Sequence, residues 1–418
     1  MRKILIVGAG QSGLQLALGL QAQGYEVTLM SNRTADEIRS GRVMSTQCMF
    51  HTALQHERDL KINFWESQAP RIEGLGVSVA GPGLQDPGAG PERAVDWVGR
   101  LDGFAQSVDQ RVKMSGWMEI LAQRGGQVVI HGAAVSDLDY FSRTYDLVLV
   151  SAGKGELVSM FERDASRSPY TEPQRALAVS YVHGLGPRPE HPEFEAVRCN
   201  IVPGVGELFV MPTLTTSGRA DILFWEGVPG GPLDVFQGVK DPAEHLSLTL
   251  ELMEKYTPWE YARATRVELT DAGGTLAGRY APTVRNPIGR LPGGGLVLGV
   301  ADVVVANDPI TGQGSNSASK CAAAYLASIV EQGEKPFDET WMQATFDRYW
   351  ETARHVTKWT NAMLGVPPEH VLGLIGAAGQ LPPVADRFAN GFNDPGDFEN
   401  YFYEPHKTEA YLASIAGA

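Results

Sequence analysis

The first residues of this 418-residue chain limit most narrowly what it can fold into. A short apolar run at Ile4–Val7 leads into the pattern G-x-G-x-x-G at Gly8, Gly10 and Gly13, and apolar residues at helical spacing follow as far as Gly24. A second apolar run then begins. This order of strand, tight turn, helix and strand predicts a parallel β-α-β unit.

The glycine pattern predicts a dinucleotide site in this unit. Gly8 permits the tight turn, Gly10 lets the backbone approach a pyrophosphate, and Gly13 lets the helix pack closely on the strand. The backbone N–H groups of the first helical residues, Gln11 and Ser12, would meet the phosphates together with the positive end of the helix dipole. The alternative is a glycine turn that serves packing alone.

The acidic residue that usually grips the adenosine ribose is missing. An Asp or Glu is expected at the end of the second strand, about 20 residues after the glycines, but Met30 or Ser31 stands there and Arg33 follows. Ser31 can still hydrogen bond, and Arg33 could contact an adenosine phosphate or the base edge. Losing a charge-assisted bond weakens the grip by roughly 1–2 kcal/mol. Either the serine suffices, or the dinucleotide is held loosely enough to exchange.

A second motif decides which dinucleotide is bound. Asp302 ends an apolar stretch, and an Asp-Pro pair and a Gly-Gln-Gly-x-Asn sequence that opens a helix follow it. This arrangement resembles the second FAD motif of the glutathione-reductase-type flavoprotein hydroxylases. The resemblance implies that Asp302 binds the ribityl chain or the pyrophosphate and that Pro309 packs beside the isoalloxazine ring. It also implies that negative charge on the flavin is stabilised by the backbone amides of Gly312, Gln313, Gly314 and Asn316.

The remaining patterns predict how the domains are arranged. An apolar strand that runs into small residues, among them Gly153, is typical of a buried parallel strand facing a ligand crevice, so Gly153 is a further cofactor candidate. We expect an α/β fold. It has a Rossmann-like FAD-binding domain of the glutathione-reductase/PHBH type, an inserted antiparallel β-sheet substrate domain and a helical C-terminus. The predicted boundaries are 1–164 and 286–335 for the FAD-binding domain, 165–285 for the β-rich domain and 336–418 for the C-terminal region.

A site for NAD(P)H is not evident. The chain has one G-x-G-x-x-G pattern and lacks the mid-chain Asp-Gly motif of the single-component aromatic hydroxylases. We therefore expect reduced, diffusible FAD to come from a separate NAD(P)H-dependent flavin reductase in a transient encounter. This expectation agrees with the weakened adenosine site.

The layout resembles the styrene/indole monooxygenase family, the epoxidase components of two-component flavoprotein monooxygenases, over almost the whole chain. The resemblance rests on GAGQSGLQLALGL, the R-x-x-S-T-Q segment from Arg42, DPITGQGSNSAS and the late KWTNAML. After the shared Arg, styrene-type members carry Asn, Val and His, whereas indole-type members carry Ser, Gln and Met. This chain has Ser45, Gln47 and Met49.

The resemblance implies a role for residues 41–50, GRVMSTQCMF. We expect a strand and turn lining the reactive face of the flavin, with Ser45, Gln47 and Met49 on one side and Met44 on the other. Arg42 would face the flavin or its phosphates, and Met44 is a further residue expected to contact the cofactor. The alternative is a half-buried strand with incidental polar residues. The further substrate-pocket positions are Ile72, Gly74 (or Gly76), Ala105 and Met211.

The implied activity is oxygen transfer to a carbon–carbon double bond. A C4a-hydroperoxyflavin formed from reduced FAD and O2 would epoxidise the C2=C3 bond of indole or an indole-like aromatic alkene. The protein would supply orientation and exclusion of water, without an acid or base. Gln47 or Ser45 could hydrogen bond the indole N–H. The alternatives are a styrene-type epoxidase, a single-component NAD(P)H-dependent aromatic hydroxylase and a non-catalytic nucleotide-binding scaffold.

Composition narrows the partners. A net charge of −14 argues against a nucleic acid or an anionic membrane surface, and the apolar runs are too short to span a membrane. Three distant cysteines fit reduced thiols in the cytoplasm and no metal site. The late apolar segment LGLIGAAG could pack on the pocket or on a second subunit, which leaves a homodimer open.

Overall fold

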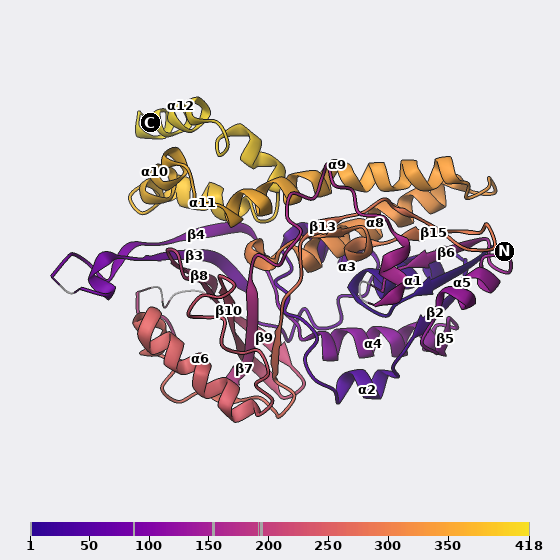
Figure 1. Ribbon diagram of the computed structural model, residues 1–418, viewed down its shortest axis with the longest axis horizontal. Helices are drawn as coiled ribbons and strands as arrows, with labels where there is room; N and C mark the ends of the chain where they lie inside the picture. The colour runs from indigo at the N-terminus through magenta and orange to yellow at the C-terminus, as the bar shows by residue number, and fades with distance from the viewer. Residues whose placement is uncertain (1, 87, 153–154, 191, 193–194, 418) are drawn as a thin grey trace.

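The computed structural model describes residues 2–86, 88–152, 155–190, 192 and 195–417. Two large sheets lie next to each other, and C-terminal helices run along one side of both (Figure 1). The parallel sheet with its helices, the second β-rich sheet and the helical C-terminus confirm the expected fold class. The division into domains by residue number stays a prediction.

The first sheet is the predicted nucleotide-binding sheet. Its strands lie in the order β14-β15-β6-β1-β2-β5, and each neighbouring pair is parallel except β14–β15. The central strands are buried apolar runs, as the sequence predicts. The bounds are β1 Lys3–Val7, β2 Glu26–Ser31, β5 Gln127–Ile130, β6 Leu147–Val150, β14 Ile288–Arg290 and β15 Leu296–Gly299.

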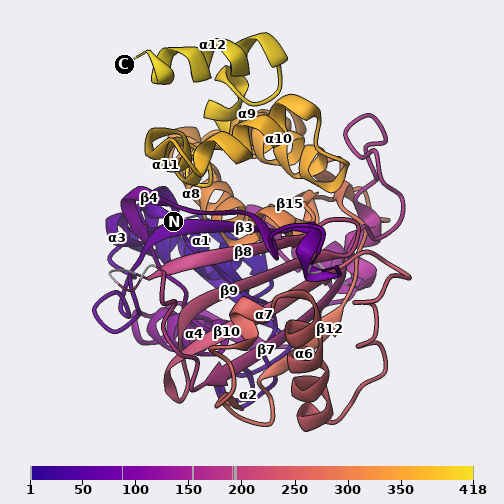
Figure 2. The same cartoon turned by 90° about the vertical axis from the view of Figure 1, so that its left-hand side faces the viewer.

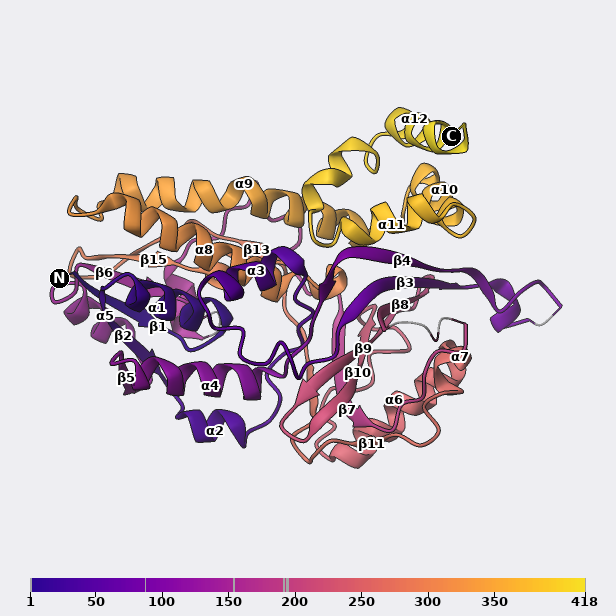
Figure 3. The ribbon, with the colours of Figure 1, turned by 180° about the vertical axis from the view of Figure 1, so that it is seen from behind.

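Helices pack on this sheet, and α1 begins at the predicted nucleotide site. The helix α1 starts directly after the glycine turn and packs between α4 and α8, while α3 lies at the junction of the two sheets (Figure 3). The bounds are α1 Gln11–Ala22, α2 Ala35–Arg39, α3 His51–Asp59, α4 Gln110–Gln123, α5 Val135–Phe141 and α8 Gly314–Gln332. The predicted strand–helix–strand order at the N-terminus is therefore confirmed.

The second sheet also includes strands from outside the predicted β-rich region. The sequence predicts an antiparallel sheet from 165–285, but β3 and β4 come from an earlier part of the chain and extend the sheet beyond β8 (Figure 2). Strand β3 joins β8 in parallel, with Gly74 opposite Ala196. The bounds are β3 Ile72–Ala80, β4 Arg93–Ala105, β7 Ala176–His183, β8 Ala196–Val202, β9 Gly206–Thr215, β10 Gly218–Gly227, β11 Glu268–Leu269 and β12 Thr275–Gly278.

The two faces of the second sheet are covered differently. Helix α6, Pro242–Tyr256, packs on the outer face around Leu223 and Trp225, and the short α7, Pro258–Tyr261, follows it. Neither helix is expected from the β-rich composition of this region. The inner face, which includes Phe209 and Phe224, packs against residues 43–50 and the C-terminal helices. The inner face is therefore the one that meets the predicted flavin site.

The C-terminal region is helical, as predicted. The helix α11 packs on β4, where the Trp97 indole N–H donates to the Ile375 carbonyl at 2.9 Å and the ring lies 5.7 Å from that of Phe388. Its bounds and those of its neighbours are α9 Glu339–Leu364, α10 Glu369–Ala378, α11 Pro382–Asn390 and α12 Pro405–Ala416. Within the part of the chain that the structure describes, none of the helices has the length and apolar character needed to cross a bilayer.

Short elements complete the chain. The strands β13, Thr283–Val284, and β16, Val305–Ala306, pair with each other. Residues 81–86 and 88–92, rich in glycine and proline, connect β3 to β4. The 3-10 turns are η1 Pro82–Leu84, η2 Glu156–Met160, η3 Ala301–Val303, η4 Pro309–Thr311 and η5 Pro395–Asn400.

A buried arginine connects the two sheets. Arg111, 2% exposed, donates from Nε to Asp109 at 2.9 Å and from both terminal nitrogens to Asp271 at 2.9 Å. It also donates to the Gly41 carbonyl at 3.2 Å. Asp109 caps the start of α4, whereas Asp271 belongs to the β11–β12 loop. Arg111 therefore holds the nucleotide domain, the second sheet and the start of residues 41–50 in one arrangement.

We predict that Arg111→Met lowers the free energy of unfolding by about 3 kcal/mol, because it leaves a buried carboxylate without its cation. Arg348→Met is the control. It breaks a pair with Glu331 in which both side chains are about half exposed or more, and should cost less than about 1 kcal/mol. Urea unfolding measures both variants, and equal losses would contradict the connecting role of Arg111.

Candidate active site

The glycine turn has the geometry that a pyrophosphate site requires. Gly8 has φ of +117°, and a Cβ on Gly13 would lie 2.1 Å from the Gly8 carbonyl oxygen and 2.4 Å from Ser151 Oγ. A Cβ on Gly10 would meet no atom within 4 Å. Gly8 and Gly13 therefore serve the turn and the packing of α1, and Gly10 borders open space beside the N–H groups of Gln11 and Ser12.

At the expected adenosine end, the side chain of Ser31 bonds within its own turn. Ser31 Oγ donates to the Arg33 carbonyl at 2.7 Å and accepts from the Arg33 amide at 3.2 Å, so it closes the turn after β2. The Arg33 guanidinium reaches Met44 Sδ at 2.8 Å. This contact brings together two predicted cofactor residues. The further candidate Gly153 lies outside the described residues.

The second predicted motif forms a turn and a helix start. Asp308 caps the turn η4 by accepting from the Ile310 amide at 3.1 Å, and Gly312 adopts the left-handed conformation with φ of +62° before α8 begins. A Cβ on Gly312 or Gly314 would meet no atom within 4 Å. Asp302 is exposed in η3, after the end of β15. The open space and the free N–H groups at the starts of α1 and α8 fit FAD, which needs anion-binding backbone at its phosphates and beside its ring.

Residues 41–50 do not form the expected strand. Among the described residues, this segment makes one strand-like pairing, the bridge of Met49 with Gln106, whose two N–H···O bonds have N···O distances of 2.8 and 2.9 Å. The backbone is held by other partners: the Val43 amide donates to the Gly273 carbonyl, and the Tyr181 hydroxyl donates to the Ser45 carbonyl at 3.0 Å. The expected alternation of sides is not regular either, since Ser45 is exposed while Gln47 and Met49 are buried.

Asn316 joins this segment to the flavin motif. It is 1% exposed in the first turn of α8, its Oδ1 accepts from the Phe50 amide at 2.8 Å, and its Nδ2 donates to the Cys48 carbonyl at 2.8 Å. The expectation for Asn316 concerned its backbone amide. Its side chain has the additional effect of fixing residues 48–50 against the start of α8, although 266 residues separate the two in the sequence.

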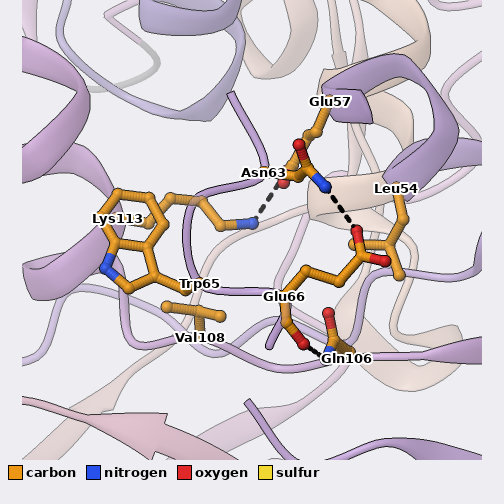
Figure 4. Close-up of a pocket in the computed structure, with 8 residues that line it drawn as sticks. All are labelled: Leu54, Glu57, Asn63, Trp65, Glu66, Gln106, Val108 and Lys113. Carbon is orange, nitrogen blue, oxygen red and sulfur yellow. Dashed lines mark hydrogen bonds and ion pairs between the residues drawn. The ribbon is translucent and has the colours of Figure 1, made fainter. Parts of the chain in front are cut away.

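A buried polar chain runs behind the segment. The Gln47 amide nitrogen donates to the Val108 carbonyl, and its oxygen accepts from Lys113 Nζ at 3.3 Å. Lys113 pairs with Glu57 at 2.8 Å beside a small cavity (Figure 4), and the Gln11 side chain donates to Glu57 at 3.1 Å. Both ends of the Gln47 amide are thus occupied, and Gln47 is connected to the first turn of α1.

Most predicted pocket residues gather on the inner face of the second sheet. Ile72 and Ala105 pair across β3 and β4 and are fully buried in the same apolar cluster as Met211. Gly74 does not join them. A bulge between Ile72 and Gly74 shifts the register, and a Cβ on Gly76, the alternative position on the same side of β3 as Gly74, would meet the Arg198 side chain at 2.8 Å. The apolar surface also contains Val179, Tyr181, Phe209, Ile222 and Phe224.

The structure contains a group of buried charged residues that the sequence patterns did not predict. Glu226 is fully buried, and Glu207, opposite it on β9, pairs with Arg175 through two bonds of 2.8 and 3.0 Å. Burial raises the pKa of Glu226 well above its ordinary value, and the charge of Asp308 adds to this. Burial also raises the pKa of Asp308 to about 6. The signal in the sequence was a Glu within the apolar strand ILFWEG.

The chain is similar in sequence to proteins named styrene monooxygenases. The family model described as "Styrene monooxygenase A putative substrate binding domain" matches residues 153–263. A protein named styrene monooxygenase StyA from Pseudomonas sp is 30% identical, covering 99% of this chain and 98% of its own. Another of that name from Pseudomonas fluorescens is 31% identical, covering 97% of this chain and 96% of its own.

Solved structures share the fold. The flavin-dependent brominase Bmp2 has a TM-score of 0.66 at 12% identity and covers 99% of each chain. PqsL of P. aeruginosa, solved in complex with 2-aminobenzoylacetate, has a TM-score of 0.61 at 12% identity and covers 94% of this chain and 99% of its own. At these identities the likeness concerns the fold alone.

Two glycine variants separate packing from phosphate binding. We predict that Gly13→Ala destabilises the fold by about 3 kcal/mol or prevents folding, because the methyl group would overlap backbone atoms. Gly10→Ala should change the unfolding free energy by less than about 1 kcal/mol and still weaken FAD binding at least about tenfold, because the methyl group would enter the expected pyrophosphate space. Thermal unfolding and FAD titration measure these effects; full FAD affinity in Gly10→Ala would refute this placement.

A variant of Asn316 tests the connection to residues 48–50. Asn316→Ala leaves a buried carbonyl and a buried amide unpaired, so we expect a loss of about 2 kcal/mol in stability and faster hydrogen exchange in residues 48–50. Gln343→Ala, which removes an exposed amide from α9, should change neither. Exchange that stays at the wild-type rate in Asn316→Ala would show that the segment is held by other contacts.

Proposed function

Since the chain belongs to the styrene monooxygenase family and is an FAD-dependent monooxygenase, we propose that it epoxidises the C2=C3 bond of indole or an indole-like aromatic alkene. FAD and O2 are the cofactor and co-substrate that membership of this family entails. The chemistry that reduced FAD supplies when bound is the activation of O2 for transfer of one oxygen atom to the substrate.

The observation that carries the choice of indole is the set Ser45, Gln47 and Met49. This set is the one that the resemblance gives to indole-type members, in place of Asn, Val and His. The place of the segment supports it, because Tyr181 of the inner sheet face bonds Ser45 and Asn316 of the flavin motif bonds residues 48 and 50. A flat aromatic substrate would lie on the apolar sheet face beside this segment.

The residues of the chain have distinct tasks in this proposal. The starts of α1 and α8 bind the phosphates and the flavin ring, with Gly10 and Gly312 leaving room for them. Asn316 and Tyr181 keep the segment in position. The apolar side chains of the inner face exclude water from the place where oxygen is transferred.

We further propose that a separate NAD(P)H-dependent flavin reductase supplies the reduced FAD. The support comes from the adenosine end, where Ser31 takes the place of an acid and is used to close its own turn. A loosely held adenosine suits a flavin that arrives and leaves between turnovers.

A styrene-type activity is the second candidate, because both full-length relatives are named styrene monooxygenases. The two candidates differ in one chemical group: indole carries an N–H that styrene lacks. Comparing the two substrates under the same conditions therefore decides between them.

We predict that the purified chain, given chemically reduced FAD and air, oxidises indole with a kcat/KM at least about tenfold above that for styrene. NADPH alone should not be consumed in the absence of a reductase. Product formation followed by chromatography and NADPH absorbance are the measurements. Preference for styrene would favour the second candidate, and NADPH consumption by the pure chain would favour a single-component hydroxylase.

A further inference from the structure

The carboxyl group of Glu226 is buried without a hydrogen-bond partner in the described part of the protein. It lies on β10 on the same face as Ile222 and Phe224, which belong to the apolar cluster of the inner face. The residue is 0% exposed, and neither Oε1 nor Oε2 has a hydrogen-bond partner among the described residues. Burying an acid without partners costs free energy that a bound ligand can recover.

The neighbours of Glu226 favour its neutral form and leave its carboxyl group free for a ligand. Glu207, opposite on β9, already binds Arg175 with both oxygens, so the cation is engaged elsewhere. Burial first, and then the charges of Asp308 and Glu207, raise the pKa of Glu226, while Arg175 lowers it less. A protonated carboxyl offers a carbonyl oxygen as an acceptor and a hydroxyl as a donor.

Glu226 continues the apolar face of β10 toward the end of the strand, near enough to the flavin motif to feel the charge of Asp308. Phe224, two residues before it, packs with Phe209 at a ring distance of 6.2 Å. Asp308, whose charge acts on Glu226, immediately precedes Pro309 in the flavin motif. The polar end of an aromatic substrate that lies on this face would meet a buried, unpartnered acid.

The residues first expected to recognise an indole N–H are used otherwise. The amide of Gln47 is bonded at both ends, to Val108 and Lys113. Ser45 is exposed, and its hydroxyl donates to the neighbouring Thr46 carbonyl at 3.2 Å. An acceptor that is both buried and unpartnered would bind a substrate N–H group more strongly than either of these.

We propose that Glu226, as a neutral carboxylic acid, accepts a hydrogen bond from the ring N–H of the substrate and thereby selects N-heteroaromatic alkenes over hydrocarbon ones. This inference rests on the proposed epoxidase function and assigns its specificity to one residue. Glutamine has the shape and the acceptor oxygen of the neutral acid, whereas leucine has the size without the acceptor.

The test compares indole with indene, which has the same ring skeleton and a CH2 group in place of the N–H. For wild type, we expect the ratio of indole to indene kcat/KM with chemically reduced FAD to exceed about ten. Glu226→Leu should lower this ratio about tenfold, and Glu226→Gln should keep it within about threefold. Equilibrium binding of indole and indene to the protein loaded with oxidised FAD should change in the same direction.

A control variant and the wild type itself keep the test decisive. Glu260→Gln weakens the pairs that another fully buried glutamate, on α7, makes with Arg188 and Arg263, so it should lower stability without changing the indole-to-indene ratio. Equal losses for both substrates in Glu226→Leu would show a structural role only and overturn the inference. If Glu226→Leu does not fold, a wild-type binding ratio near one overturns it equally well. Oxidation of neither substrate by wild type would instead refute the proposed function.

Discussion

The side-chain amide of Asn316 holds together the parts on which the site depends. It belongs to the helix that opens after the second flavin motif, and its two bonds of 2.8 Å hold the backbone on either side of Met49. A segment without regular strand pairing would otherwise have several free backbone groups and many conformations. Because Asn316 is buried, these bonds are not exchanged for water, and the wall of the site keeps a fixed position relative to α8.

Other buried polar groups extend this connection in two directions. The chain from Gln47 through Lys113 and Glu57 reaches Gln11 at the start of α1, so both expected FAD-binding helix starts are bonded to residues 47–50. Arg111 does the same for the second sheet through Asp271. The apolar sheet face, the flavin motifs and the intervening segment are thus one assembly, in which oxygen transfer needs exclusion of water more than it needs a strong base.

The sequence predicted what local patterns determine and missed what distant pairing determines. The predictions of the glycine turn, α1 and the central parallel strands were confirmed, because backbone chirality and apolar periodicity act over a few residues. Strand β3 was not assigned to the second sheet, because strand partners are chosen by contacts across the fold. The segment 41–50 has strand-like alternation, but its neighbours offer side chains instead of a free strand edge. Glu226 was not predicted as a site residue, because the sequence does not show whether a single Glu in an apolar strand is buried, as it is here.

The central claim is that a diffusible, reduced flavin docks at the starts of α1 and α8, where the positive ends of two helices face its negative charges. Anaerobic titration of the pure protein with reduced and with oxidised FAD tests this claim most directly. The account predicts tighter binding of the reduced form, by about tenfold or more. No measurable affinity for reduced FAD, or a preference for the oxidised form, would contradict it.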